Sequence, residues 1–199
     1  MFIKICGITQ LENALEVADT GVSALGLILT TSPRQLSPEK AREIASALKG
    51  KLWLVGVTQD LPPQQALELA QFIGLDALQL HGQEPAAWAR QIGAVLPVIK
   101  ALKLTGPADP SFLNYPAWAL LADSAVPGSG QSYRPEWVLA LKSHPRLILA
   151  GGITPANACA RVQAVRPFGL DVSSGVETSP GFKDPAAVRA LLRAVADCP

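Results

Sequence analysis

The sequence predicts an α/β fold in which eight parallel strands close into a barrel surrounded by helices. Short apolar runs alternate with amphipathic segments along the chain, which is typical of a parallel sheet covered by helices. Eight such units of about 25 residues each fit the lower size limit of a (β/α)8 barrel. An open doubly wound sheet is the alternative, but the turn after the first strand is CGIT and lacks the G-x-G-x-x-G pattern.

The strands are predicted from apolar runs whose polar residues lie close to the carboxyl end. A charge deeper in an apolar sheet would lose its hydration and would need a partner to offset that loss. The runs occupy residues 2–6, 24–29, 51–57, 76–81, 96–102, 117–123, 146–152 and 167–175. Residues 103–116 show no helical pattern, so the fifth helix is expected to be short or missing.

The helices are predicted from their spacing and from their capping residues. Thr9 followed by Glu12 forms a capping-box pattern for the first helix, and Gly21 is expected to end that helix. Ser37 is the expected N-cap of the second helix, with Pro38 at its first position. The remaining helices are expected at residues 62–73, 84–92, 135–143, 154–165 and 184–196.

The composition limits the classes of partner. A net charge of +1 and a charged fraction of 17% give no electrostatic reason to expect nucleic acid or an anionic membrane surface. No apolar run approaches the roughly 20 residues of a membrane span. The start of the chain, MFIKICGIT, enters a strand directly and lacks the pattern of a signal peptide. We therefore expect a cytoplasmic protein in which residues 1–199 form one domain.

The three cysteines are odd in number and far apart in the sequence. This argues against a disulfide framework, and the spacing does not match a zinc site. Cys159 and Cys198 are interpreted as a small buried side chain and an idle terminal residue. No metal and no other cofactor is expected. Cys6 differs from the other two because it ends the first strand.

Reactive side chains gather at the predicted carboxyl ends of the strands, where the active sites of barrels lie. They are Cys6, Arg34, His81, Asp123 and Asp171. Side chains alternate along a strand, so Lys4 is expected to face the barrel interior with Cys6, and Gln79 with His81. Lys4 is expected to pair with a carboxylate there.

Two glycine-rich segments indicate a phosphate site. Gly151 and Gly152 follow the seventh strand, and Ser173, Ser174 and Gly175 follow the eighth. Both segments offer backbone N–H groups with little obstruction, and the corresponding loops of barrels commonly bind phosphate.

Six motifs together resemble the phosphoribosylanthranilate isomerase family of tryptophan biosynthesis, in order and nearly end to end. They are KICGIT (4–9), SPR (32–34), LQLHG (78–82), the end of a strand at Asp123 with the loop Gly128-Ser129-Gly130, LAGGITPAN (149–157) and DVSSGVETSPGFKD (171–184). The last of these motifs is the most specific.

The resemblance implies an Amadori rearrangement of N-(5-phosphoribosyl)anthranilate, catalysed by a monomer or a homodimer without a cofactor. Asp123 corresponds to the general acid that opens the sugar ring, and Cys6 to the general base that removes the C2′ proton. We expect cationic surroundings to lower the pKa of Cys6. Arg34 corresponds to the contact with the anthranilate carboxylate, while Asp171 and His81 correspond to residues that line the site.

Two other interpretations remain. A different sugar-phosphate barrel enzyme is one, but the aminoaldose isomerase of histidine biosynthesis uses two aspartates, and Cys6 speaks against it. The other is a barrel without catalytic activity that binds a phosphorylated metabolite. Such a protein would have no use for an acid and a thiol at two separate strand ends.

Overall fold

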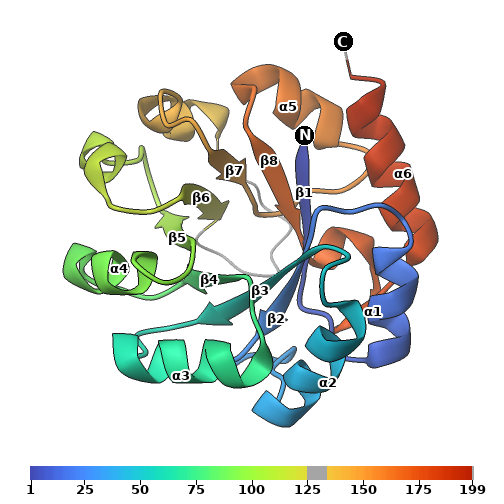
Figure 1. Ribbon diagram of the computed structural model, residues 1–199. Helices are drawn as coiled ribbons and strands as arrows, with labels where there is room; N and C mark the ends of the chain where they lie inside the picture. The colour runs from blue at the N-terminus through green and yellow to red at the C-terminus, as the bar shows by residue number, and fades with distance from the viewer. Residues whose placement is uncertain (125–133, 199) are drawn as a thin grey trace.

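The computed structural model describes residues 1–124 and 134–198, and eight parallel strands form a closed barrel at its centre, as predicted. In chain order the strands are β1 (Phe2–Cys6), β2 (Ala24–Ile28), β3 (Trp53–Thr58), β4 (Ala77–Leu80), β5 (Val98–Leu104), β6 (Ala119–Ser124), β7 (Leu147–Leu149) and β8 (Gly169–Val172). Pairing of β1 with β8 closes the barrel. The helices lie around its outside (Figure 1).

Six α-helices lie in the described part of the chain: α1 (Leu11–Ala18), α2 (Pro38–Leu48), α3 (Pro63–Ile73), α4 (Ala86–Gly93), α5 (Ala158–Val165) and α6 (Pro185–Ala196). Three 3-10 helices accompany them: η1 (Pro110–Asn114), η2 (Pro135–Leu141) and η3 (Ser174–Val176). The fifth helix is therefore short, as predicted, and the sixth is a 3-10 helix. No helix in residues 1–124 or 134–198 is both long enough and apolar enough to cross a membrane.

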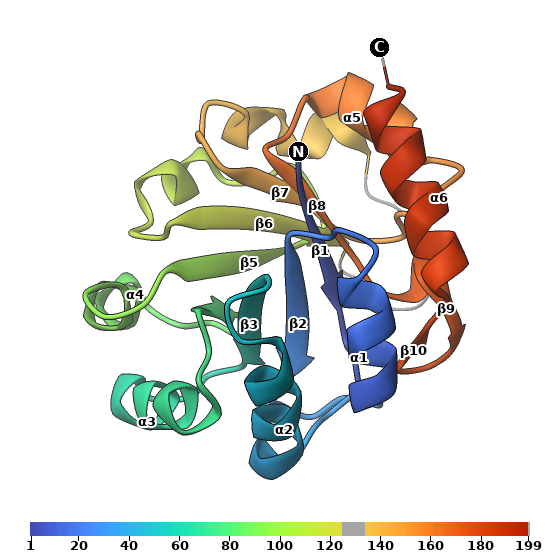
Figure 2. The same cartoon turned by 45° about the vertical axis from the view of Figure 1, so that its right-hand side comes forward.

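A small antiparallel hairpin, β9 (Glu177–Ser179) and β10 (Phe182–Lys183), follows β8 and lies beside α1 (Figure 2). The Asn13 side chain of α1 accepts a hydrogen bond from the backbone N–H of Lys183 and donates one to its carbonyl, both at 2.8 Å. Since Asn13 and Lys183 are buried, these bonds fix the hairpin against α1.

The predicted caps are correct for α2 and wrong for α1. Ser37 accepts a hydrogen bond from the Lys40 backbone, and Pro38 occupies the first turn. The N-cap of α1 is Gln10, because the Thr9 hydroxyl instead donates to the Gly181 carbonyl at 2.8 Å. The helix itself ends at Ala18, and Gly21 lies in the turn that follows, with φ of +90°.

The barrel interior is packed below its carboxyl end. Four aromatic side chains fill the amino-terminal end of the barrel, with ring centroids 4.9–6.2 Å apart: Phe2, Trp53, Trp118 and Phe168. Above them lies a layer of small and aliphatic residues that includes Ala24, Val55, Ile99 and Leu121. Polar groups inside the barrel are consequently concentrated at the carboxyl ends of the strands.

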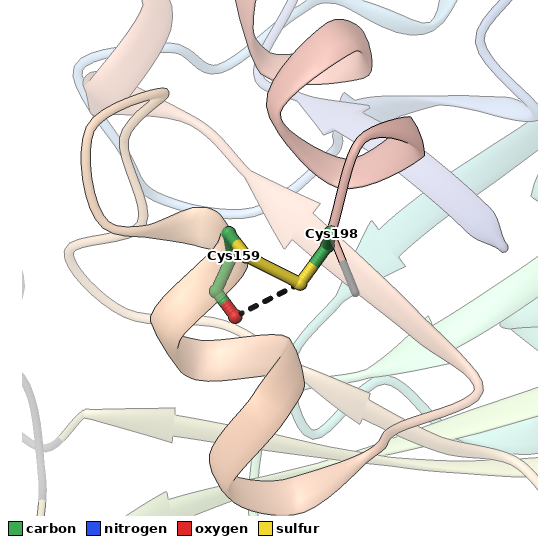
Figure 3. Close-up of a disulfide and its surroundings, with 2 residues drawn as sticks. All are labelled: Cys159 and Cys198. Carbon is green, nitrogen blue, oxygen red and sulfur yellow. Dashed lines mark hydrogen bonds between the residues drawn. A yellow bond between two sulfur atoms is a disulfide. The ribbon is translucent and has the colours of Figure 1, made fainter.

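The interpretation of Cys159 and Cys198 is wrong, because the two residues form a disulfide (Figure 3). Cys159 lies in α5 and Cys198 follows α6. They are 39 positions apart in the sequence, but their Cα atoms are separated by 5.3 Å. Consecutive helices of a barrel are neighbours in its outer ring, so this fold brings together two cysteines whose sequence spacing is uninformative.

We expect Cys159→Ala to lower the free energy of unfolding by about 3–4 kcal/mol, because closing a loop of this length restricts the unfolded chain. Urea denaturation without reductant measures the difference, and Cys198→Ala should give the same value. The free energy of unfolding of the double variant should be lowered no more than that of either single variant. If a reductant leaves the unfolding transition of the wild-type protein unchanged, this would contradict a stabilising role of the disulfide.

Candidate active site

All the predicted site residues line one cavity at the carboxyl ends of the strands. The cavity has a volume of about 540 Å³. Its lining includes Cys6, Arg34, His81, Asp123, Gly151, Gly152, Asp171, Ser173, Ser174 and Gly175. Gln79 lines it as well, as strand alternation predicts. The predicted loop Gly128-Ser129-Gly130 lies outside the described residues.

A buried ion pair forms the floor of this cavity. The Lys4 ammonium of β1 donates to both carboxylate oxygens of Asp171 in β8, each at 2.9 Å. Lys4 is fully buried, and Asp171 is 8% exposed. The two residues are direct partners in the register of β1 and β8. This confirms that Lys4 pairs with a carboxylate inside the barrel.

Gly26 of β2 makes room for this pair and for the thiol beside it. A β-carbon at this position would lie 2.6 Å from the Cys6 sulfur and 2.9 Å from the Lys4 nitrogen. Cys6 and Gly26 are also direct partners in the register. The missing side chain therefore leaves the space in which the thiol and the ammonium meet.

The pKa of Cys6 is raised, contrary to the sequence expectation. Burial raises it most, and the Lys4 ammonium lowers it, but the Asp171 carboxylate raises it again. Because Asp171 balances the charge of Lys4, the ammonium does not outweigh the cost of burying a thiolate. Cys6 is thus a neutral thiol in the ligand-free protein at neutral pH.

His81 lies between Gln79 and the acidic residue of β6. Its Nε2 atom is 3.6 Å from Asp123 Oδ2, and its Nδ1 atom is 3.0 Å from Gln79 Nε2. Burial, followed by the ammonium groups of Lys103 and Lys4, lowers the pKa of His81 to about 4. The imidazole is neutral at pH 7. With Gln79 donating to Nδ1, its proton lies on Nε2 and faces Asp123.

Arg34 is held in the cavity wall by a carboxylate that the sequence analysis did not select. Its Nε and Nη2 atoms donate to Glu177 at 2.7 and 2.6 Å. Lys183 donates to the same carboxylate at 2.6 Å. Burial opposes ionisation of Glu177, but these donors prevail and lower its pKa to about 2. Glu177 and Lys183 both lie in the DVSSGVETSPGFKD motif, which was the available signal.

The two glycine-rich loops form one wall of the cavity. Gly151 and Gly152 adopt φ of +82° and +63°, a conformation that favours glycine. Asn157 donates to the Gly152 carbonyl at 2.8 Å and accepts from the Thr154 backbone at 2.9 Å, which secures the first loop. A β-carbon at Gly175 would collide with the Ile153 carbonyl, so the second loop packs closely on the first.

The comparisons with known proteins agree on one family. The family model of N-(5'phosphoribosyl)anthranilate (PRA) isomerase matches residues 3–194. N-(5'-phosphoribosyl)anthranilate isomerase of Thermotoga maritima is 39% identical, and that of Desulforudis audaxviator is 40% identical, with 96% of this chain and 96% of each relative covered. These matches confirm the resemblance that the motifs indicate.

Solved structures agree as well. Phosphoribosyl anthranilate isomerase from Thermus thermophilus superposes with a TM-score of 0.92 at 47% identity, covering 98% of both chains. A second isomerase superposes with a TM-score of 0.89 at 35% identity, with 98% of both chains covered. That protein is in complex with reduced 1-(o-carboxyphenylamino)-1-deoxyribulose 5-phosphate.

We expect Gly26→Ala to lower the free energy of unfolding by about 1–3 kcal/mol, because the added methyl group must displace the Cys6 sulfur or the Lys4 ammonium. Urea denaturation measures this loss. Gly93→Ala is the matched control, since a β-carbon at the end of α4 would have no neighbour within 4 Å. Equal stability of the two variants would contradict the crowding at Gly26.

We expect NMR titration of the His144→Gln variant, whose only imidazole is His81, to give a midpoint near pH 4. In the unfolded chain His81 binds a proton below about pH 6.5, whereas in the folded chain it does so only near pH 4. His81 therefore destabilises the fold as the pH falls between these values, by roughly 2 kcal/mol at pH 5.

His81→Gln should remove this part of the pH dependence of unfolding. A titration midpoint above pH 6 would instead indicate that His81 is charged beside Asp123.

Proposed function

This chain belongs to the N-(5'-phosphoribosyl)anthranilate isomerase family, and from that premise we propose that its cavity converts N-(5-phosphoribosyl)anthranilate into 1-(2-carboxyphenylamino)-1-deoxyribulose 5-phosphate. The reaction is a step of tryptophan biosynthesis. One observation carries the assignment of the site: Cys6 and Asp123 line the same cavity as the two glycine-rich loops. A thiol and a carboxyl can therefore act on one phosphorylated sugar.

The phosphate is assigned to the wall made by residues 151–152 and 173–175. The protein has a net charge of only +1, so local groups must bind the anion. Backbone N–H groups in loops without bulky side chains suit this task, since they approach the oxygens directly. The loops after β7 and β8 are the usual phosphate site of a barrel.

Asp123 is assigned as the general acid. It donates its proton to the ring oxygen while the C1′–O bond breaks, and the nitrogen lone pair forms the C1′=N bond of a Schiff base. Neutral His81, 3.6 Å away, directs its Nε2 proton toward the carboxyl group and holds it in place. His81 is thus a positioning residue in this proposal.

Cys6 is assigned as the general base. Its thiolate removes the proton on C2′, and the electron pair of that C–H bond moves to form the C1′=C2′ bond of an enolamine. Tautomerisation then places a proton on C1′ and gives the ketone at C2′. Because Cys6 rests as a thiol, it first releases its proton to solvent, and the Lys4 ammonium can stabilise the thiolate that forms.

Arg34 and Asp171 are assigned supporting roles. Arg34 keeps N–H groups that Glu177 does not occupy, and these can contact the carboxylate of the substrate. Asp171 positions Lys4 under the thiol through both carboxylate oxygens. Neither residue transfers a proton in this scheme.

We infer that residues 1–199 act as one catalytic domain, in the cytoplasm, as a monomer or a homodimer, on a small-molecule substrate. A related solved structure from Thermotoga maritima is described as a monomer generated from a dimeric enzyme. Outside hyperthermophiles, a disulfide such as Cys159–Cys198 is rarely kept in a reducing compartment. The number of free thiols that this protein carries in fresh lysate therefore tests its location in the cytoplasm.

We expect Asp123→Asn and Cys6→Ser each to lower kcat by at least about 10²-fold, since each removes one proton-transfer group. The assay mixes protein with freshly made phosphoribosylanthranilate and follows loss of the fluorescence of the substrate against spontaneous hydrolysis. Binding of inorganic phosphate and the circular dichroism spectrum should not change.

Asp197→Asn, which alters an exposed carboxylate after α6, is the control and should keep full activity. Turnover of either site variant within about threefold of wild type would contradict its assigned role, given the usual size of such effects.

A further inference from the structure

Lys103 is a cation at the mouth of the barrel that the scheme above does not use. It lies near the end of β5 and is the direct register partner of Asp123 in β6. Alternation along β5 places it on the same face as Ile99 and Ala101, which are buried inside the barrel. Lys103 accordingly lines the cavity that holds Asp123 and His81.

The charge of Lys103 is not matched by a carboxylate in the described part of the chain. The other cationic side chain of the lining in the described residues is Arg34, which is paired with Glu177. Within residues 1–124 and 134–198, no carboxylate lies within 4.0 Å of the Lys103 nitrogen. The ammonium nevertheless acts on the site, since after burial it contributes most to lowering the pKa of His81.

The layout of the cavity indicates which part of the substrate meets this cation. The phosphate lies against the loops after β7 and β8 in the proposed function, and the acid and the base lie on the flanking strands, β6 and β1. The sugar is therefore held in this half of the barrel, and the aromatic ring extends toward β2–β5. Lys103 is the second-to-last residue of β5 and lies on that side. The ring carries a carboxylate that loses water when it enters the cavity.

We propose that Lys103 is a specificity-determining residue whose ammonium binds the carboxylate on the aromatic ring of the substrate. This inference rests on the proposed function and adds a second cation to Arg34. A carboxylate in a half-enclosed site needs a charged donor to offset its desolvation. Arg34 already shares its charge with Glu177, whereas no carboxylate of residues 1–124 or 134–198 pairs with Lys103.

The test compares two ligands on Lys103→Met, which removes the charge and keeps the length of the side chain. One ligand is reduced 1-(o-carboxyphenylamino)-1-deoxyribulose 5-phosphate, and the other is its counterpart without the ring carboxylate. We expect the dissociation constant of the first to rise about 10- to 100-fold and that of the second to change less than about twofold, as for a charged hydrogen bond. Lys103→Arg should keep most of the affinity.

In turnover, Lys103→Met should raise KM by a similar factor and change kcat little, because the carboxylate is bound equally in the ground state and the transition state. Lys142→Met, at an exposed position after η2, is the control and should leave both constants unchanged.

Two outcomes would overturn the inference. Equal weakening of both ligands would show that Lys103 shapes the site without recognising the carboxylate, and no weakening of either would show that it is a solvated lysine. Wild-type protein that binds neither ligand would instead reject the proposed function itself, so the two failures can be told apart.

Discussion

The buried ion pair between Lys4 and Asp171 is the interaction on which the site depends. It joins the first strand to the last, so the same contact that completes the barrel also forms the floor of the cavity. Burying two charges costs several kcal/mol per ion unless their geometry compensates, and here both carboxylate oxygens lie 2.9 Å from the ammonium. The pairing that closes the sheet therefore also positions Lys4 beside Cys6, and Gly26 leaves the space for both side chains.

This pair also sets the chemistry of the thiol. An isolated ammonium beside Cys6 would favour the thiolate, but Asp171 balances that ammonium and burial favours the neutral form. The resting site therefore avoids a buried anion that has no partner. In the proposed mechanism the thiolate is needed only while C2′ is being deprotonated, and Lys4 is already in place to stabilise it then. The sequence analysis expected the cation next to Cys6 to lower its pKa and did not weigh the burial of the thiol, which has the largest effect on that pKa.

The features that could be predicted from the sequence are those that depend on residues close together in the chain. The inward faces of Lys4 with Cys6 and of Gln79 with His81 were predictable, because alternation along a strand has a period of two residues. Which residues face each other across strands depends on register and closure, which no local pattern contains. Lys103 shows this limit: the predicted strand ends at residue 102, and only the pairing of β5 with β6 places Lys103 beside Asp123. The disulfide was missed for the same reason, since α5 and α6 become neighbours only in the closed ring.

The charges around the cavity indicate the charge that its ligand must carry. Four buried or half-buried cations in the described residues are paired with carboxylates: Lys4 with Asp171, Lys100 with Glu84, and Arg34 and Lys183 with Glu177, which they share. Lys103 differs from these cations, because no carboxylate in the described residues pairs with it. An ammonium of this kind facing the cavity is expected where the substrate supplies the anion. The substrate of the proposed reaction has two anionic ends. Backbone N–H groups can meet the phosphate without using any of these cations, so the charge of Lys103 remains available for the ring carboxylate.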